Sequence, residues 1–216
     1  MTAGIFSFIS DLTDGLADWA GNWWFLAVIF GVAYLDSVVP VVPSETTVII
    51  GGVAVATGEA GYPLYAVIIA GAVGAFLGDN TAYAIGRRFS ERFERRAERK
   101  PKFAMRLRWA SDQIRQRGGL LLITARFIPG GRTALTLSSG ITKQPKFWFV
   151  RWVALAVVIW ATYAAGLAYI IGTPLKDNHT AAFWVAFGTA LSINVFIELF
   201  RHFRLKRHKV MAPEMS

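Results

Sequence analysis

The apolar residues of this chain gather into long stretches instead of alternating with polar residues. Residues 64–85 and 147–172 form two such stretches. As helices of about 33 Å and about 39 Å, both are long enough to cross a hydrocarbon core of about 30 Å. A third stretch, residues 181–200, would give a helix of about 30 Å. The pattern therefore predicts an all-α polytopic membrane protein.

A fourth apolar stretch, residues 23–57, is interrupted by Pro40 and Pro43. The helix should stop before these prolines and restart after Ser44, the candidate N-cap residue. The restarted helix, residues 46–57, would be only about 18 Å long, which is too short to span the membrane alone. We therefore expect residues 23–57 to form a re-entrant helical hairpin.

Residues 119–141 repeat this arrangement. An apolar arm leads to Pro129, Gly130 and Gly131, and Thr133 is placed to cap a second short helix of about 14 Å. Because this helix is also too short to span, the segment predicts a second re-entrant hairpin.

The order of the segments predicts an inverted repeat. The first hairpin precedes the crossing at 64–85 and the second follows it, so the two hairpins would enter from opposite faces of the membrane. Many secondary transporters are built from inverted repeats of this kind. A full crossing by residues 26–42 is the alternative, and it would move the N-terminus to the other side.

The distribution of charge predicts an orientation. The net charge is +9, and lysine and arginine are concentrated in the loop 86–117 and the tail 201–216. Basic loops stay on the cytoplasmic side, so we expect both segments to lie inside. No lysine or arginine precedes Arg87, so we expect the N-terminus to lie outside. Residues 1–20 have apolar residues at helical spacing, which predicts an amphipathic helix lying at the membrane interface. The basic residues flank apolar stretches, so nucleic acid is not an expected partner.

Composition excludes several kinds of chemistry. Only 17% of the residues are charged and 54% are hydrophobic, whereas about 25% are charged in soluble domains. The absence of cysteine excludes a disulfide framework and a thiolate nucleophile. His179, His202 and His208 do not have the spacing of metal ligands, so neither a metal site nor a cofactor is predicted.

Four charged residues, Glu45, Asp79, Arg126 and Arg132, lie inside the apolar segments. A charge at the bilayer centre costs about 2.5–3.5 kcal/mol on insertion scales, so these side chains should face a cavity or one another. Structural ion pairs are one explanation. A functional site is favoured, because ionisable residues within a membrane commonly mark transport pathways.

The two arginines predict an anion site. The planar guanidinium fork of Arg126 and of Arg132 suits phosphate, and Gly130 and Gly131 between them let backbone approach a ligand closely. Arg132 near a helix N-terminus is electrostatically unfavourable unless a negative group meets it. We expect either Glu45 or an anionic ligand, most simply a lipid phosphate, to supply that charge.

The carboxylates predict coupling to protons. If Glu45 or Asp79 lies beside a bound anion, it must take up a proton or move away for binding to be favourable. Tyr83, four residues after Asp79, shares its helix face, and Asn80 and Ser44 are expected supporting residues. A polar stripe that packs against neighbouring helices is an equally good explanation of Asp79 and Tyr83.

Several short strings then resemble a known family: Pro43-Ser44-Glu45, Gly78-Asp79-Asn80 followed by Tyr83 and Gly86-Arg87, Arg126-Phe127-Ile128-Pro129-Gly130-Gly131-Arg132, and Ser139-Gly140. Together they resemble the DedA family of bacterial membrane proteins, also called the VTT or SNARE-associated group. The resemblance assigns residues 21–172 to the family's membrane domain. It implies opposed re-entrant hairpins and movement of lipids between leaflets, and family members include undecaprenyl phosphate translocases. Carried over residue by residue, it makes Glu45, Asp79, Arg126 and Arg132 the functional set.

The leading hypothesis is a flippase of the bacterial cytoplasmic membrane that moves an anionic lipid phosphate, polyprenyl or glycerophospholipid, with protons as the candidate coupling ion. A proton-coupled cation antiporter using Glu45 and Asp79 is one alternative. A membrane-assembly factor without transport is another. An intramembrane phosphatase is a third, but no histidine or cysteine lies in the predicted membrane segments. The sequence is compatible with a homo-oligomer.

Overall fold

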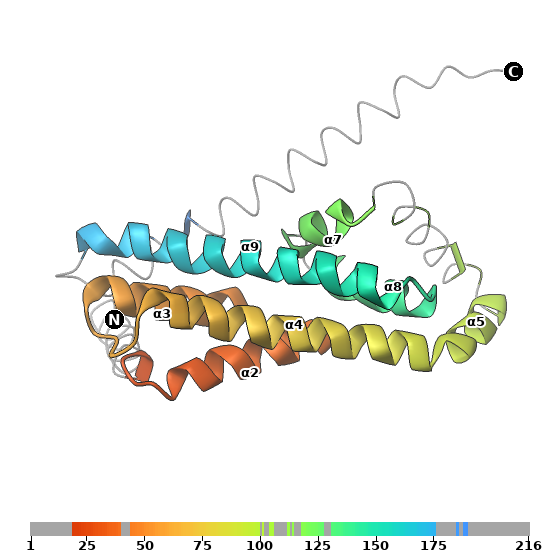
Figure 1. Ribbon diagram of the computed structural model, residues 1–216, viewed down its shortest axis with the longest axis horizontal. Coiled ribbons are helices and arrows are strands. Elements are labelled where there is room, and N and C mark those ends of the chain that lie inside the picture. The colour runs from red at the N-terminus through yellow and green to blue at the C-terminus, as the bar shows by residue number, and fades with distance from the viewer. Residues whose placement is uncertain are drawn as a thin grey trace, which may run out of the picture.

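The computed structural model describes residues 19–39, 44–99, 118–127 and 131–175, together with 101, 104–105, 112, 114, 185 and 188–189. Within these residues all regular secondary structure is helical, which confirms the predicted all-α class (Figure 1). The predicted interfacial helix at 1–20, the basic loop beyond residue 99, the predicted spanning helix at 181–200 and the tail at 201–216 lie wholly or largely outside the described residues.

Two long antiparallel helices, α4 (Leu64–Arg88) and α9 (Lys146–Gly172), pack against each other along the length of the structure (Figure 1). At about 38 Å and about 41 Å, both are long enough, and apolar enough, to cross a membrane. Large apolar side chains on the outer surface of α4 are exposed at four-residue spacing: Tyr65, Ile69, Val73 and Leu77. We expect this stripe to face lipid in a bilayer.

Two shorter apolar helices, α2 (Phe25–Val38) and α3 (Ser44–Thr57), come first along the chain. Each is about 21 Å long, which is less than the hydrocarbon thickness. α2 packs along α4, whereas α3 packs mainly along α9. The helix therefore breaks in the region of the two prolines, as the sequence predicted, and the two arms contact different long helices.

The second interrupted segment begins with α7 (Leu120–Thr124) and continues through the 3-10 turn η1 (Ala125–Phe127) to α8 (Gly131–Ile141). α7 packs against α9, and α8 packs against α4. The predicted N-cap role of Thr133 is wrong, because α8 begins at Gly131 and places Thr133 inside its first turn. The Thr133 hydroxyl instead donates to the carbonyl of Ser37, 3.4 Å away, near the C-terminal end of α2.

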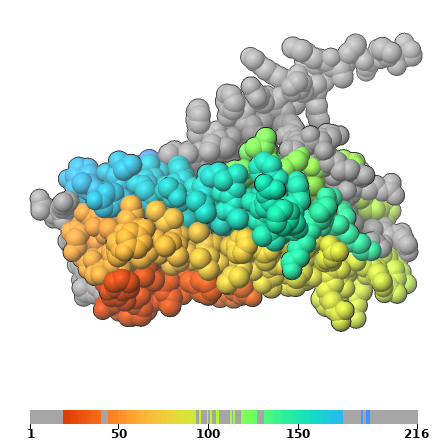
Figure 2. Space-filling model, viewed as in Figure 1, coloured from red at the N-terminus to blue at the C-terminus, as the bar shows by residue number. Residues whose placement is uncertain are grey.

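The space-filling view shows how closely these layers pack. α8 and α9 lie along one side of α4, and α2 lies along the other side (Figure 2). Beyond the end of α4 the chain continues into α5 (Ser90–Arg99), which carries the first part of the basic loop. α4 is thus the element around which both interrupted segments meet.

An aromatic cluster lies at the opposite end of α4 from α5. The buried Tyr62 hydroxyl donates to the carbonyl of Ala20, and its ring lies edge-on to Trp23. Burial raises the pKa of Tyr62 to about 12, so this hydroxyl keeps its proton over the physiological range. Trp19, Trp23 and Trp24 are exposed nearby, as expected of side chains at a membrane–water interface.

The α4–α8 contact requires two glycines. A Cβ at Gly140 would overlap the carbonyl oxygen of Tyr83, and a Cβ at Gly86 would overlap the carbonyl oxygen of Leu137. The two backbones therefore touch without intervening side chains. Small residues allow such close approach of helices in membranes.

Gly140→Ala is expected to lower the free energy of unfolding by about 1–3 kcal/mol, because the added methyl group forces α8 away from α4. Gly166→Ala in α9 is the matched control, since a Cβ there has no neighbour within 4 Å. The control should keep or slightly raise stability, by up to about 1 kcal/mol. Thermal unfolding in detergent micelles measures both. Equal melting temperatures for the two variants would contradict the close α4–α8 contact.

Candidate functional site

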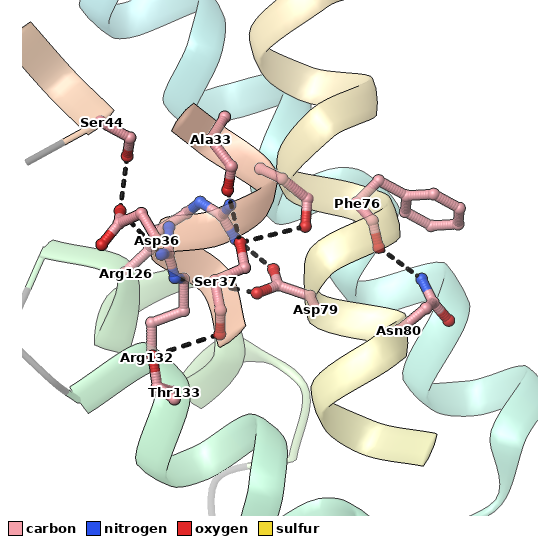
Figure 3. Close-up of polar contacts among 11 residues, drawn as sticks. Ala33, Asp36, Ser37, Ser44, Phe76, Asp79, Asn80, Arg126, Arg132 and Thr133 are labelled. Atoms are coloured by element: carbon pink, nitrogen blue, oxygen red, sulfur yellow. Dashed lines mark hydrogen bonds and ion pairs between the residues drawn. The ribbon is translucent and has the colours of Figure 1, made fainter. Parts of the chain in front are cut away.

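A buried ion pair lies where η1 meets α4. Asp79 is near the middle of α4, and Arg126 projects from η1, so that Arg126 Nη1 donates to Asp79 Oδ2 over 2.7 Å (Figure 3). The two side chains are only 2% and 1% exposed. Charges this well buried are stable only when paired, so the contact fixes η1, in the second interrupted segment, against α4.

A second ion pair lies beside the first. Arg132, in the first turn of α8, donates from Nη2 to Asp36 Oδ2 near the end of α2, over 2.8 Å (Figure 3). Arg132 Nε also lies 3.7 Å from Asp79 Oδ1. The Ser44 hydroxyl, at the start of α3, donates to the same oxygen of Asp36 over 2.6 Å. One polar network therefore joins α2, α3, α4, η1 and α8.

The network is electrically balanced. The two carboxylates, Asp36 and Asp79, face the two guanidinium groups, Arg126 and Arg132, so the four residues sum to zero charge. Balance explains how four ionisable groups fit among apolar helices. It also has a chemical consequence, because an anion that takes the place of a carboxylate on its arginine must displace that carboxylate, or the carboxylate must be protonated.

Asp36 was not among the site residues predicted from the sequence. It interrupts an apolar stretch in the same way as Asp79 does, so the cost of a charge at membrane depth was a signal that applied to it too. What hid its role is distance along the chain, since its arginine partner is 96 residues away.

Glu45 or an anionic ligand was expected to meet Arg132, and the structure places Asp36 there instead. In the part of the chain that the structure describes, Asp36 pairs with Arg132, and Glu45 makes no ion pair. Glu45 acts on Arg126 only as a nearby negative charge. Successive residues of a helix point about 100° apart, so once Ser44 faces Asp36, the next side chain is turned away.

Two predicted supporting residues of α4 lie outside the cluster. The Asn80 amide donates to the carbonyl of Phe76 over 2.8 Å and points away from Asp79 (Figure 3). The Tyr83 hydroxyl donates to the Gln144 carbonyl over 2.6 Å and accepts from Arg87, while its ring stacks on Phe149. Tyr83 therefore links the backbone of the turn between α8 and α9 to the C-terminal part of α4 by a hydrogen bond.

The glycines of the predicted anion site are described only in part. Gly131 is the first residue of α8, directly before Arg132, whereas Gly130 lies outside the described residues. No group of three or more histidine, cysteine, aspartate or glutamate side chains suited to a metal ion occurs among the residues that the structure describes.

Several buried polar atoms of the cluster lack a hydrogen-bond partner within the described segments. They are Asp79 Oδ1, Nε and Nη2 of Arg126, and Nε1 of Trp160 on α9. The Arg126 guanidinium lies over the Trp160 ring, 5.1 Å from its centroid. A buried donor or acceptor without a partner costs about 1–3 kcal/mol, so a polar group bound on this side of Arg126 would recover part of that cost.

Comparison with known proteins places this site in a wider context. The VTT domain family model matches residues 42–170, a range that includes Asp79, Arg126 and Arg132. Undecaprenyl phosphate transporter A of Bacillus subtilis is 24% identical over 178 residues, which cover 81% of this chain and 85% of that protein. Protein DedA of Escherichia coli K12 is 22% identical over 185 residues, 84% of each chain. An alkaline phosphatase-like protein of Lactococcus lactis subsp. cremoris is 30% identical over 158 residues, 69% of this chain and 71% of that protein. No solved structure matches the chain significantly.

Proposed function

Because this chain belongs to the VTT domain family, the DedA group of membrane proteins, we propose that it moves a lipid phosphate between the leaflets of the bacterial cytoplasmic membrane. Undecaprenyl phosphate is the substrate that we propose first, since one relative is named as its transporter. The proposed orientation has the N-terminus outside and the C-terminus in the cytoplasm, as the positive-inside rule favours.

The observation that carries the proposal is the position of Arg132 between two carboxylates. Its guanidinium contacts Asp36 on α2 at 2.8 Å and approaches Asp79 on α4 at 3.7 Å. A guanidinium binds phosphate with the same fork that it offers to a carboxylate. A lipid phosphate can therefore take the place of Asp36, and the carboxylate and the ligand alternate on one arginine.

The packing of the short helices supports alternating access. α3, from the first interrupted segment, packs on α9, while α8, from the second, packs on α4. Each short helix thus contacts the long helix of the other half, and this reciprocal packing supports the proposed inverted repeat. We propose that rocking of these halves exposes the arginine cluster first to one leaflet and then to the other.

Asp36 is the carboxylate that we propose to exchange with the ligand. Its side chain is 13% exposed, whereas that of Asp79 is 1% exposed. The groups that face Asp36 are Arg132 and Ser44, with Asp79 behind Arg132. Protonation of Asp36 would release Arg132 to the phosphate, and this step would couple lipid movement to a proton gradient.

Leaflet exchange in proteoliposomes tests the function. Labelled undecaprenyl phosphate should exchange faster in vesicles containing the protein than in empty vesicles, and equally labelled, uncharged undecaprenol should not. Acceleration of neither lipid would contradict the proposal. Cation-dependent proton flux in the same vesicles would then favour the antiporter alternative.

Asp36→Asn is expected to keep leaflet exchange but to abolish its dependence on an imposed proton gradient. Asparagine resembles the protonated carboxyl group in size and charge, so Arg132 is released at any pH. Glu91→Gln, on the exposed surface of α5, is the matched control and should respond to the gradient like the wild type. A gradient response that Asp36→Asn leaves intact would exclude Asp36 as the coupling residue.

A further inference from the structure

Trp160 is unusual in its position and in its hydrogen bonding. It lies near the middle of α9 and is 2% exposed, whereas tryptophans of membrane proteins are concentrated at the interfaces. A buried indole N–H normally has an acceptor. In the part of the chain that the structure describes, Trp160 Nε1 has none.

Arg126 beside it also has donors to spare. Its Nη1 is used by Asp79, while Nε and Nη2 have no acceptor among the described residues. Nε and Nη2 together form one edge of the guanidinium group, and two parallel N–H groups on such an edge bind an oxyanion in bidentate fashion. The side chain is 2% exposed, so this free edge lies in the protein interior.

The two sets of donors occupy one small region. The guanidinium carbon of Arg126 lies 5.1 Å from the centroid of the Trp160 ring, which holds the cation against its face. Asp79 on the one side and the indole ring on the other leave Arg126 little freedom to turn. Three buried N–H donors without an acceptor among the described residues therefore belong to two side chains in contact: Nε and Nη2 of Arg126 and Nε1 of Trp160.

We propose that Trp160 is a ligand-binding residue, which donates its indole N–H to an oxygen of the phosphate group that the free edge of Arg126 holds. This inference rests on the proposed function and deepens it. A planar carboxylate uses both of its oxygens on the guanidinium edge, whereas the tetrahedral phosphate has a further oxygen for the indole. Because the indole is neutral, it adds selectivity for phosphate without adding charge to the balanced cluster.

The indole N–H signal of Trp160 in a ¹H–¹⁵N spectrum tests the contact directly. The full-length protein, with its eight tryptophans labelled, is titrated in detergent micelles with inorganic phosphate and with short-chain phosphatidic acid. Trp160→Phe identifies the signal by its loss, and Trp160→Tyr gives a second route if the first variant does not fold. We expect the Trp160 signal to move to lower field, while that of Trp152, on the same helix, stays in place. A response to phosphatidic acid alone assigns the site to a lipid headgroup, and a response to both ligands assigns it to the phosphate group itself.

The affinity of Trp160→Phe separates a binding role from a packing role. Phenylalanine keeps a ring under Arg126 and removes only the N–H group, so the phosphate lipid should bind about tenfold more weakly, the effect of one hydrogen bond. If the wild type binds phosphate but the indole signal and the affinity of Trp160→Phe are unaltered, the inference fails and the proposed function stands. If the wild type binds no phosphate lipid, the proposed function fails as well.

Discussion

Arg126→Met is expected to lower the free energy of unfolding by about 3–5 kcal/mol, because the buried Asp79 loses its hydrogen-bonded partner and keeps only the longer contact with Arg132 Nε, 3.7 Å away. Methionine replaces most of the length of the side chain, so the loss reports on the charge and not on a large cavity. Denaturant or thermal unfolding in detergent measures the change. Arg151→Met is the matched control, since Arg151 is exposed and has no contact with the cluster.

The double variant Arg126→Met with Asp79→Leu separates stability from function. Removal of both charges leaves no unpaired group, and apolar replacement of a buried ion pair is often neutral or stabilising. We expect the double variant to regain most of the lost stability and to remain inactive in leaflet exchange. Full exchange by this folded, uncharged variant would show that the Arg126–Asp79 pair serves packing alone.

Arg132→Gln is expected to abolish most lipid exchange with a much smaller effect on stability. Glutamine can still donate to Asp36, and Asp36 also keeps its hydrogen bond from Ser44. The Asp36 carboxylate near the end of α2 therefore keeps two hydrogen-bond donors. The ligand, in contrast, loses the cation that receives it. Loss of one partner of a buried charge pair costs about 2 kcal/mol or more, which weakens lipid-phosphate binding at least about 25-fold.

The initial rate of exchange of labelled undecaprenyl phosphate, compared at equal amounts of folded protein, measures this effect. Arg151→Gln, outside the cluster, should exchange at the wild-type rate. An Arg132→Gln rate within twofold of the wild type would mean that the phosphate does not pass this arginine.

The sequence predicted the elements of this structure better than their contacts. The prolines at 40 and 43 located the break between α2 and α3, because proline ends a helix wherever it occurs in the chain. The high cost of intramembrane charge marked Asp79, Arg126 and Arg132, which do lie together. Both signals are local, so they can be seen without knowledge of the fold.

The pairing of these charges depends on tertiary structure and could not be predicted in the same way. Which carboxylate meets Arg132 is decided by the rotation of α2 and α3 about their axes, and this favours Asp36 over Glu45. Tyr83 shares a face with Asp79 but lies about 6 Å further along α4, which is enough to place it in a separate cluster with Gln144. Helical spacing predicts the direction in which a side chain points from the helix axis, whereas the packing of neighbouring helices decides which residues that side chain contacts.

The start of α8 shows the same limit. Thr133 is a good N-cap residue by type, but α8 begins at Gly131, and the threonine hydroxyl serves the end of α2 instead. Carbonyl groups in the last turn of a helix lack intrahelical partners, so the Ser37 carbonyl accepts a hydrogen bond from the Thr133 hydroxyl. Only the packing of the first interrupted segment against the second brings the two groups together.

The central claim is that the buried arginines form a binding site for a lipid phosphate. Native mass spectrometry of the detergent-solubilised protein, which counts bound lipids, tests this most directly for the wild type, Arg132→Gln, the Arg126→Met, Asp79→Leu double variant and Arg151→Gln. We predict that the wild type and Arg151→Gln retain one undecaprenyl phosphate per chain and that the two cluster variants lose it. Equal retention by all four proteins would contradict the claim.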